Sequence, residues 1–179
     1  MSPLVVLVGP PGAGKTTVAT AVAARLGAAM RDTDEDIVRA ESMSVAEVFI
    51  DKGEGYFREL ETVAVRDALA SHEGVLALGG GAVINRNIRE LLKAERVVFL
   101  DVGLAAAVKR VGMNANRPLL LGNVRAQLKL LMDERRVLYG EVASFIVDTD
   151  DLDAEQVADS VVAFLNEHRL NAHRLEENS

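Results

Sequence analysis

A phosphate-binding motif near the N-terminus contains the residues of this chain that are most informative about chemistry. Residues 9–16 read GPPGAGKT and fit the pattern G-x-x-x-x-G-K-[ST]. Glycines let backbone N–H groups turn inward and approach a polyphosphate, and the helix that follows points its positive dipole end at the same anion. Lys15 can reach the terminal phosphates, and the Thr16 hydroxyl can ligate Mg²⁺. The alternative is a glycine turn that binds nothing.

The sequence on both sides of this motif has the pattern that such a loop requires. An apolar run, Leu4–Val8, precedes it, and a helix is expected over Thr16–Leu26, ended by Gly27. A strand, a glycine loop and a helix in this order are the context in which the motif binds phosphate. The residues expected to contact a nucleotide here are Gly12, Ala13, Gly14, Lys15, Thr16 and Thr17.

Two carboxylates follow the second expected strand, in the segment Asp32-Thr33-Asp34. Ligands of open α/β sheets bind where the strands end, and side chains at i and i+2 of an extended segment point the same way. One carboxylate can then hold Mg²⁺, directly or through water, while the other accepts a proton from a substrate hydroxyl. The alternative is structural, with Asp34 as the N-cap of the helix expected after it.

Three successive glycines, Gly79, Gly80 and Gly81, follow the expected strand Val75–Leu78. Such a run has a high conformational entropy when unfolded, and it is tolerated where the backbone must turn sharply or touch a ligand. A simple strand-to-helix turn is the alternative. The position at the binding edge of the sheet favours contact with a ligand through backbone N–H groups.

Basic side chains recur in the second half of the chain, at Lys109, Arg110, Arg117, Arg135 and Arg136. Residues 112–123, GMNANRPLLLGN, lie between two expected helices and are predicted to form a mobile lid that carries Arg117. Arginine stays charged and matches phosphate or carboxylate geometry with two donors. A surface arginine considered alone is usually a solvated charge, and Arg58 is ambiguous in the same way.

Alternating strands and helices must position these residues. The expected strands are Leu4–Val8, Ala28–Arg31, Val75–Leu78, Val97–Val102 and Phe145–Asp148, and the expected helices are Thr16–Leu26, Asp34–Glu41, Val45–Lys52, Glu54–Ala70, Asn85–Lys93, Leu104–Arg110, Val124–Val142 and Ala154–His168. Four of the strands are near-continuous apolar runs, as expected for parallel strands buried on both faces, whereas the second is short and weak. The pattern predicts a doubly wound α/β sandwich with right-handed crossovers.

Composition limits the classes to which this fold can belong. The chain has 179 residues, 49% hydrophobic and 26% charged, which predicts one soluble globular domain. Its net charge of −7 argues against a nucleic-acid partner. It has no cysteine, which suits a cytoplasmic protein. We expect neither a signal peptide nor a membrane span, and a polar C-terminal end, from Asn166, that frays.

Together these segments resemble the shikimate kinase family over almost the whole chain. The matching landmarks are GPPGAGKT at 9–16, DTD at 32–34, F-R-x-x-E at 57–61, GGGAV at 79–83, R-P-L at 117–119 and R-x-x-L-Y at 135–139. The first is common to many nucleotide-binding proteins, and the ordered set of the others is much more specific. The resemblance implies transfer of the γ-phosphoryl group of ATP to the 3-hydroxyl of shikimate, a step toward chorismate and the aromatic amino acids.

The resemblance also implies the details of the fold. It gives a nucleoside monophosphate kinase-like, three-layer sandwich with a five-stranded parallel sheet in the order 2-3-1-4-5. One kinase domain would cover residues 1–170, with a substrate-binding subdomain at about 33–61, a lid at about 112–124 and a disordered polar tail at 171–179. The partners would be shikimate and ATP, with Mg²⁺ as cofactor, and the protein would be a cytoplasmic monomer without a nucleic-acid or membrane partner.

Roles follow from the resemblance residue by residue. On the nucleotide side, Thr16 and Asp32 would hold the magnesium, Lys15 and Arg117 would meet the phosphates, and Arg110 would lie near adenine. On the acceptor side, Asp34 would be the hydroxyl ligand and base, and Arg58, oriented by Glu61, would bind the carboxylate. The remaining acceptor residues would be Gly79, Gly80, Gly81, Arg135, Phe49 and Phe57, with Val45 and Leu119 as further walls.

The chain departs from the family pattern at two places. Val137 stands where R-x-P-L-Y has proline, and counting back from Tyr139 selects Arg135 rather than Arg136 as the second carboxylate ligand. The segment Asp150–Asp153 is acidic where relatives often carry polar, basic or proline residues beside adenine. Two other functions stay open on the sequence alone: another small-molecule kinase, for gluconate or a nucleoside monophosphate, and a non-catalytic nucleotide-binding protein.

Overall fold

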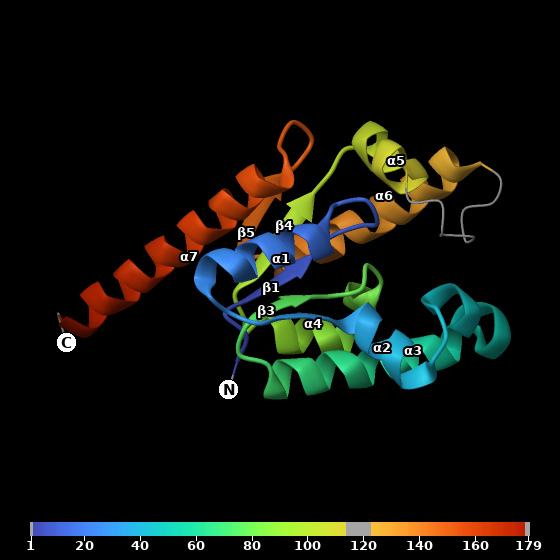
Figure 1. Ribbon diagram of the computed structural model, residues 1–179, viewed down its shortest axis with the longest axis horizontal. Helices are drawn as coiled ribbons and strands as arrows, with labels where there is room; N and C mark the ends of the chain where they lie inside the picture. Colours follow the sequence, from blue (N-terminus) through green and yellow to red (C-terminus); the bar gives the residue numbers. More distant parts are fainter. Residues whose placement is uncertain (1, 114–122, 178–179) are drawn as a thin grey trace.

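Five short parallel strands form one sheet at the centre of the molecule (Figure 1). The structure is a computed structural model that describes residues 2–113 and 123–177. Its elements are β1 (Val5–Val8), α1 (Lys15–Leu26), β2 (Met30–Asp32), α2 (Thr33–Glu41), α3 (Val45–Ser71), β3 (Val75–Ala77), the 3₁₀ turn η1 (Ala82–Ile84), α4 (Arg86–Leu92), β4 (Val97–Asp101), α5 (Leu104–Met113), α6 (Val124–Val142), β5 (Phe145–Asp148) and α7 (Ala154–Glu177). The strand order β2-β3-β1-β4-β5 confirms the prediction.

The central strand β1 shows why the strands read as continuous apolar runs. Successive side chains of a strand point to opposite faces, so Val5 and Leu7 enter one hydrophobic core while Val6 and Val8 enter another. The first core lies under α1 and α7, and the second lies under α3, α4 and the C-terminal part of α6 (Figure 1). Helices on both faces bury every strand position of β1, which leaves ligands only the ends of the strands.

Local capping residues determine where several helices begin and end. Gly14 precedes α1 with φ 81°, and Gly27 ends it with φ 60°, two left-handed positions that glycine adopts without strain. Ser44 and Glu47 form a reciprocal capping box at the start of α3. These signals are local in sequence, which explains why the predicted starts lie within one residue of the observed ones for α1 and α3.

A small third core, separate from the two that cover the sheet, joins α2 to the first part of α3. Its buried members are Ile37, Val48 and Phe57, with Phe49 packed against them. Within α3, the backbone at Gly53 is not helical, with φ 83° and ψ 166°. The break predicted between Lys52 and Glu54 is therefore a kink of one residue rather than a loop.

The largest differences between predicted and observed boundaries are in β2, α5 and α7. Strand β2 extends to Asp32 rather than ending at Arg31, and α5 continues to Met113. Helix α7 continues to Glu177, so the fraying predicted from Asn166 is wrong for residues 166–177. These residues include no glycine or proline and are rich in leucine, arginine and glutamate, which favour a helix even in a polar sequence. None of the helices in the described ranges combines the length and the apolar character that a membrane span needs.

We predict that Gly53→Ala lowers the free energy of unfolding by about 1–3 kcal/mol, because L-residues rarely adopt the backbone conformation of this position. Gly55→Ala is the matched control. Both positions have open space for a methyl group, but Gly55 has helical backbone, so alanine there should add about 0.4–1 kcal/mol. Equilibrium urea unfolding measures both changes, and equal effects of the two substitutions would contradict the strain at the kink.

Candidate active site

The phosphate loop has the backbone geometry that its glycines predict. Gly12 and Gly14 have φ values of 83° and 81°, and a Cβ at Gly12 would come within 2.9 Å of the Ala107 carbonyl oxygen of α5. The Nζ of Lys15 donates to the carbonyl oxygens of Gly9 at 2.8 Å and Pro10 at 3.2 Å. The ammonium group is thus held against the inside of the loop, at the N-terminus of α1, where an anion is stabilised by the helix dipole.

The carboxylate of Asp32 connects the start of α1 to the start of α2. Its Oδ2 accepts a hydrogen bond from the Thr16 hydroxyl at 2.8 Å, and its Oδ1 accepts one from the backbone N–H of Asp34 at 2.9 Å. Asp32, not Asp34, is therefore the N-cap of α2, which corrects the structural alternative considered for Asp34. Because the cap starts a helix at once, Asp34 lies in the first turn of α2 rather than on an extended segment with Asp32.

The oxygen atoms of Thr16 and Asp32 are the hard donors that Mg²⁺ prefers. In the described part of the chain no group of three or more histidine, cysteine or acidic side chains could hold a metal by itself. In proteins Mg²⁺ is usually held by one or two side chains together with substrate phosphates and water. The residues present therefore suit a magnesium ion that arrives with a nucleotide.

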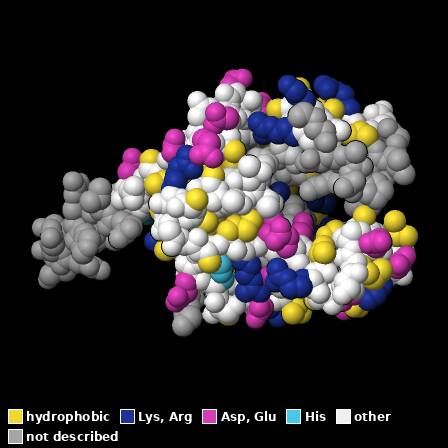
Figure 2. All heavy atoms as spheres, in the orientation of Figure 1, with side chains coloured by type: hydrophobic (Ala, Val, Ile, Leu, Met, Phe, Trp, Pro, Cys, Tyr) yellow, Lys and Arg dark blue, Asp and Glu magenta, His cyan; other side chains and the backbone are white. Residues whose placement is uncertain are grey.

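Two adjoining cavities extend from this loop along the strand ends. The first has a volume of about 370 Å³ and is lined by Pro11, Gly12, Gly14, Lys15, Thr16, Thr17, Asp32, Asp34, Leu78, Gly80 and Arg110. The second, of about 230 Å³, shares Gly14, Thr17 and Arg110 with it and continues to Thr149 and Asp153. In the space-filling view the molecule is hollowed beside the lobe that carries α2 and α3, with basic side chains visible inside (Figure 2).

Arg110 joins the phosphate loop to the end of β5. Its guanidinium donates to the Gly12 carbonyl oxygen at 3.3 Å, to the Thr149 hydroxyl at 3.0 Å and to the Thr149 carbonyl oxygen at 2.6 Å. Two side chains of the acidic segment 150–153 accept hydrogen bonds from backbone N–H groups. Asp150 accepts from the Gly103 N–H at 2.6 Å, and Asp153 caps α7 by accepting from the Gln156 N–H at 2.8 Å. Two of the aspartates by which segment 150–153 departs from the family pattern, Asp150 and Asp153, therefore have a structural role, since they bind backbone N–H groups.

Arg58 on α3 lies at the other end of the cleft, between a buried and an exposed carboxylate. It donates to Glu61 at 2.8 Å and to Glu54 at 3.3 Å, and Glu61 is only 1% exposed. The guanidinium also lies over the rings of Phe49 and Phe57, which are tilted against each other, at 5.7 and 5.5 Å from their centroids. These contacts fix its orientation, which is what two-donor recognition of a planar anion requires.

Charged side chains lie against the first and third glycines of the turn. A Cβ at Gly79 would overlap the Asp34 carboxylate, and a Cβ at Gly81 would overlap the Arg58 guanidinium. At Gly80 the nearest atom, in Pro11, would be 3.4 Å away. The glycine turn therefore brings the backbone within contact distance of both groups, and it lies between the phosphate loop and the Arg58 guanidinium.

The two neighbouring arginines of α6 lie in different environments. Arg136 is 66% exposed and forms an ion pair with Asp101. Arg135 is partly buried, its charge acts on both Glu61 and Tyr139, and within the described residues its buried Nε has no hydrogen-bond partner. The structure thus places Arg135 in a partly buried position where its charge acts on Glu61, whereas Arg136 is exposed and pairs with Asp101.

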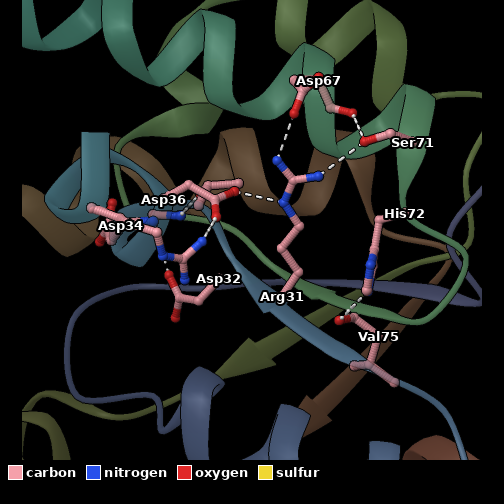
Figure 3. Close-up of polar contacts among 11 residues, drawn as sticks. Arg31, Asp32, Asp34, Asp36, Asp67, Ser71, His72 and Val75 are labelled. Carbon is pink, nitrogen blue, oxygen red and sulfur yellow. Dashed lines mark hydrogen bonds and ion pairs between the residues drawn. The ribbon is translucent and has the colours of Figure 1, made fainter. Parts of the chain in front are cut away.

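A network around Arg31 holds α2 in place behind the site (Figure 3). The guanidinium contacts Asp36 at 2.6 Å, Asp67 at 2.7 Å and the Ser71 hydroxyl at 3.0 Å, so it joins β2 to α2 and to the end of α3. Asp34 is two residues before Asp36 in the same helix. The network therefore restrains the turn that carries the Asp34 carboxylate.

Three polar residues of this region were not selected as site residues from the sequence. Thr33 is fully buried and accepts a hydrogen bond from the Gly79 N–H at 3.0 Å, Thr149 contacts Arg110, and the Tyr139 hydroxyl contacts Gly80. Their neighbours in sequence gave the only hint, since each lies beside or within a recognised motif. Arg117 and Leu119 lie outside the described residues, as do positions 114–122 of the predicted lid.

This fold and this site define a P-loop kinase that acts on a small molecule. The family model described as shikimate kinase matches residues 11–166. Shikimate kinase from Streptomyces coelicolor is 53% identical over 161 residues, which are 90% of this chain and 94% of that protein. Shikimate kinase from Streptomyces avermitilis is 54% identical over 160 residues, which are 89% of this chain and 94% of that protein.

Solved structures agree with the sequence relatives. Shikimate kinase from Acinetobacter baumannii, in complex with shikimate, superimposes with a TM-score of 0.89 at 34% identity, covering 95% of this chain and 96% of that one. A gluconokinase from Sinorhizobium meliloti, at 20% identity and a TM-score of 0.62, shares the fold alone. The chain belongs to the shikimate kinase family, and it is an ATP-dependent kinase.

Burial of Glu61 leads to a prediction about pH. Desolvation raises the pKa of Glu61 above its ordinary value of 4.5, although Arg58 and Arg135 act to lower it. The folded state therefore holds this proton more tightly than the unfolded state does, so the contribution of Glu61 to stability falls as the pH rises from about 4.5 through the raised pKa. The difference in unfolding free energy between wild type and Glu61→Gln should shrink or reverse over that range in urea titrations.

The control is Glu54→Gln, which removes the exposed carboxylate on the same guanidinium. That variant retains Glu61 and should keep the wild-type dependence on pH in this range. A Glu61→Gln variant whose stability follows the wild-type curve at every pH would show that the buried carboxyl group does not titrate as described.

Proposed function

We propose that this kinase transfers the γ-phosphoryl group of ATP to the 3-hydroxyl of shikimate, giving shikimate 3-phosphate and ADP. The observation that carries the proposal is that the Arg58 guanidinium, paired with the buried Glu61, lies against the glycine turn, while the charge of Arg135 also acts on Glu61. Two arginines suit a small acceptor that bears a carboxylate. The high identity to shikimate kinases over nine-tenths of the chain supports the same acceptor.

The nucleotide occupies the glycine loop in this proposal. The N–H groups of Gly12, Ala13, Gly14, Thr16 and Thr17 surround its phosphates, and Arg110 lies toward the adenine along the second cavity. Lys15 leaves the carbonyl oxygens of the loop for the β- and γ-phosphates and stabilises the charge that develops during transfer. Thr16 and Asp32 hold the magnesium ion, which neutralises phosphate charge when bound.

The acceptor lies on the opposite side of the cleft. Asp34 orients the attacking hydroxyl and accepts its proton, since it lines the same cavity as Lys15. The carboxylate of the acceptor binds Arg58 and Arg135, Glu61 holds Arg58 in place, and the glycine turn contributes backbone N–H groups. Phe49 supports the guanidinium with its ring, and the buried Phe57 supports Phe49.

Further assignments follow the family. We propose a single kinase domain whose acceptor-binding subdomain is residues 33–61, which the separate core of α2 and α3 supports. Residues 112–124 would act as the lid, and Arg117 would meet the transferring phosphoryl group. The protein would be a cytoplasmic monomer without nucleic-acid partners, which its acidic net charge and its lack of cysteine support.

Release of ADP with shikimate as acceptor tests the proposed function directly. Shikimate should support turnover, and 3-dehydroshikimate, which has a ketone in place of the 3-hydroxyl, should not. Quinate is a second comparator, since it keeps that hydroxyl but has a saturated ring with an added hydroxyl at the carbon that bears the carboxylate. Gluconate and nucleoside monophosphates test the alternative acceptors. Binding of ATP without ADP release for any acceptor would instead indicate a nucleotide-binding protein without kinase activity.

Lys15→Met should lower kcat by on the order of 10²-fold or more, because the substitution keeps side-chain length but removes the charge beside the phosphates. Lys129→Met, at an exposed lysine of α6 that pairs with Asp133, is the control and should keep wild-type turnover. Steady-state ADP release measures both. Wild-type turnover by Lys15→Met would remove the phosphate-loop assignment.

Arg135→Ala should weaken shikimate binding by about 2–5 kcal/mol, the loss expected when one partner of a buried charge pair is removed. Arg136→Ala should change it by less than about 1 kcal/mol, because that guanidinium is mostly exposed and already pairs with Asp101. Titration calorimetry with shikimate distinguishes the two. The opposite ranking would make Arg136, rather than Arg135, the second ligand of the shikimate carboxylate. Small effects of both substitutions would leave that carboxylate with Arg58 as its single arginine ligand in the proposal.

A further inference from the structure

The hydroxyl of Tyr139 donates a 2.6 Å hydrogen bond to the Gly80 carbonyl oxygen, in the middle of the glycine turn. Tyr139 is 1% exposed, and its ring packs against Phe99 of β4 with 5.1 Å between the ring centroids. Burial raises the pKa of Tyr139 to about 12, so the hydroxyl keeps its proton and remains a donor at any pH at which the enzyme works. The proposed roles of the site residues leave this contact unused.

The contact completes a set of anchors, one for each peptide group of the turn. The N–H of Gly79 donates to the Thr33 hydroxyl at 3.0 Å, and the carbonyl oxygen of Gly79 accepts from the Ala82 N–H at 3.1 Å. The third anchor is the bond from Tyr139 to the Gly80 carbonyl oxygen. Since a trans peptide group is planar, with its C=O and N–H antiparallel, fixing the carbonyl of Gly80 fixes the N–H of Gly81 as well.

Glycine needs these anchors more than any other residue. Its peptide groups can rotate through conformations closed to other residues, so three glycines in sequence would otherwise have many orientations. The anchors of Gly79 come from its own neighbourhood in the sheet and turn, namely Thr33 and Ala82. The anchor of Gly80 comes from α6, one helical turn beyond Arg135, on the same face of the helix.

We propose that Tyr139 is a positioning residue for the acceptor: its hydroxyl fixes the orientation of the Gly80–Gly81 peptide group and holds it in register with Arg135. The inference rests on the proposed function, because the acceptor is taken to contact both the turn and Arg135. In this proposal the buried Tyr139 hydroxyl keeps the backbone N–H groups of the turn in a fixed position relative to the Arg135 guanidinium of α6. The phosphate loop is not part of this coupling.

Tyr139→Phe tests the proposal because it removes the hydroxyl and keeps the ring. Without the anchor, the KM for shikimate should rise about tenfold, the scale expected when a buried carbonyl loses its donor, while the KM for ATP should stay within about twofold. Tyr56→Phe is the matched control, since Tyr56 is the only other tyrosine of the chain and donates to Glu41 from an exposed position of α3. It should leave both constants unchanged.

A second measurement tests the hydrogen bond from Tyr139 to Gly80 independently of which acceptor the enzyme uses. In ¹H–¹⁵N NMR spectra of the free protein, Tyr139→Phe should shift the amide signals of Gly80 and Gly81, and Tyr56→Phe should not. Unchanged glycine signals would overturn the inference even if shikimate were not the acceptor. Failure of the wild-type enzyme to phosphorylate shikimate would instead count against the proposed function, and the NMR comparison would still decide the anchor.

The kinetic pattern distinguishes a positioning role from a purely structural one. A lower melting temperature with an unchanged KM for shikimate, or equal losses for shikimate and ATP, would overturn the proposal. If Tyr139→Phe does not fold, 3-fluorotyrosine incorporated into the Tyr56→Phe variant labels Tyr139 alone and keeps its hydroxyl. Its ¹⁹F signal should then shift on addition of shikimate, and a signal that does not move would also overturn it.

Discussion

The two oxygens of the Asp32 carboxylate hold together the strand ends on which the site is built. One accepts from Thr16 at the start of α1, and the other accepts from the first turn of α2. Because this one side chain bonds to the first turn of α1 and to that of α2, it restrains the separation of the phosphate loop and the Asp34 carboxylate. Arg31 stabilises the arrangement from behind by joining α2 to the end of α3. The relative position of the two helices therefore depends on a carboxylate that is itself buried.

The glycine turn is where the remaining parts of the molecule meet. Asp34 and Arg58 lie directly against Gly79 and Gly81, and Thr33 and Tyr139 bond to its backbone. Side chains from α2, α3 and α6 thus converge on a segment that has no side chains of its own. Absence of side chains lets charged groups approach the backbone, and the hydrogen bonds limit the freedom that glycine brings.

The sheet and the phosphate loop could be predicted because their signals are local: buried strands read as apolar runs, and the loop has fixed spacing. Contacts across long sequence separations could not be predicted from residue patterns. Thr33 and Gly79 are 46 residues apart, and Tyr139 and Gly80 are 59 apart, so nothing near either partner indicates the bond. Asp32 and Asp34 are both good N-caps, and only the backbone decides between them. Arg135 was selected by resemblance, and its burial beside Glu61 comes from the fold.

The separate core of α2 and the first part of α3 has a consequence for how this lobe behaves. Its buried members are few, and the kink at Gly53 marks the point where α3 leaves the two large cores of the sheet. Local opening of such a unit costs much less than global unfolding, because little apolar surface is exposed. This lobe can therefore open locally while the sheet and the phosphate loop stay folded.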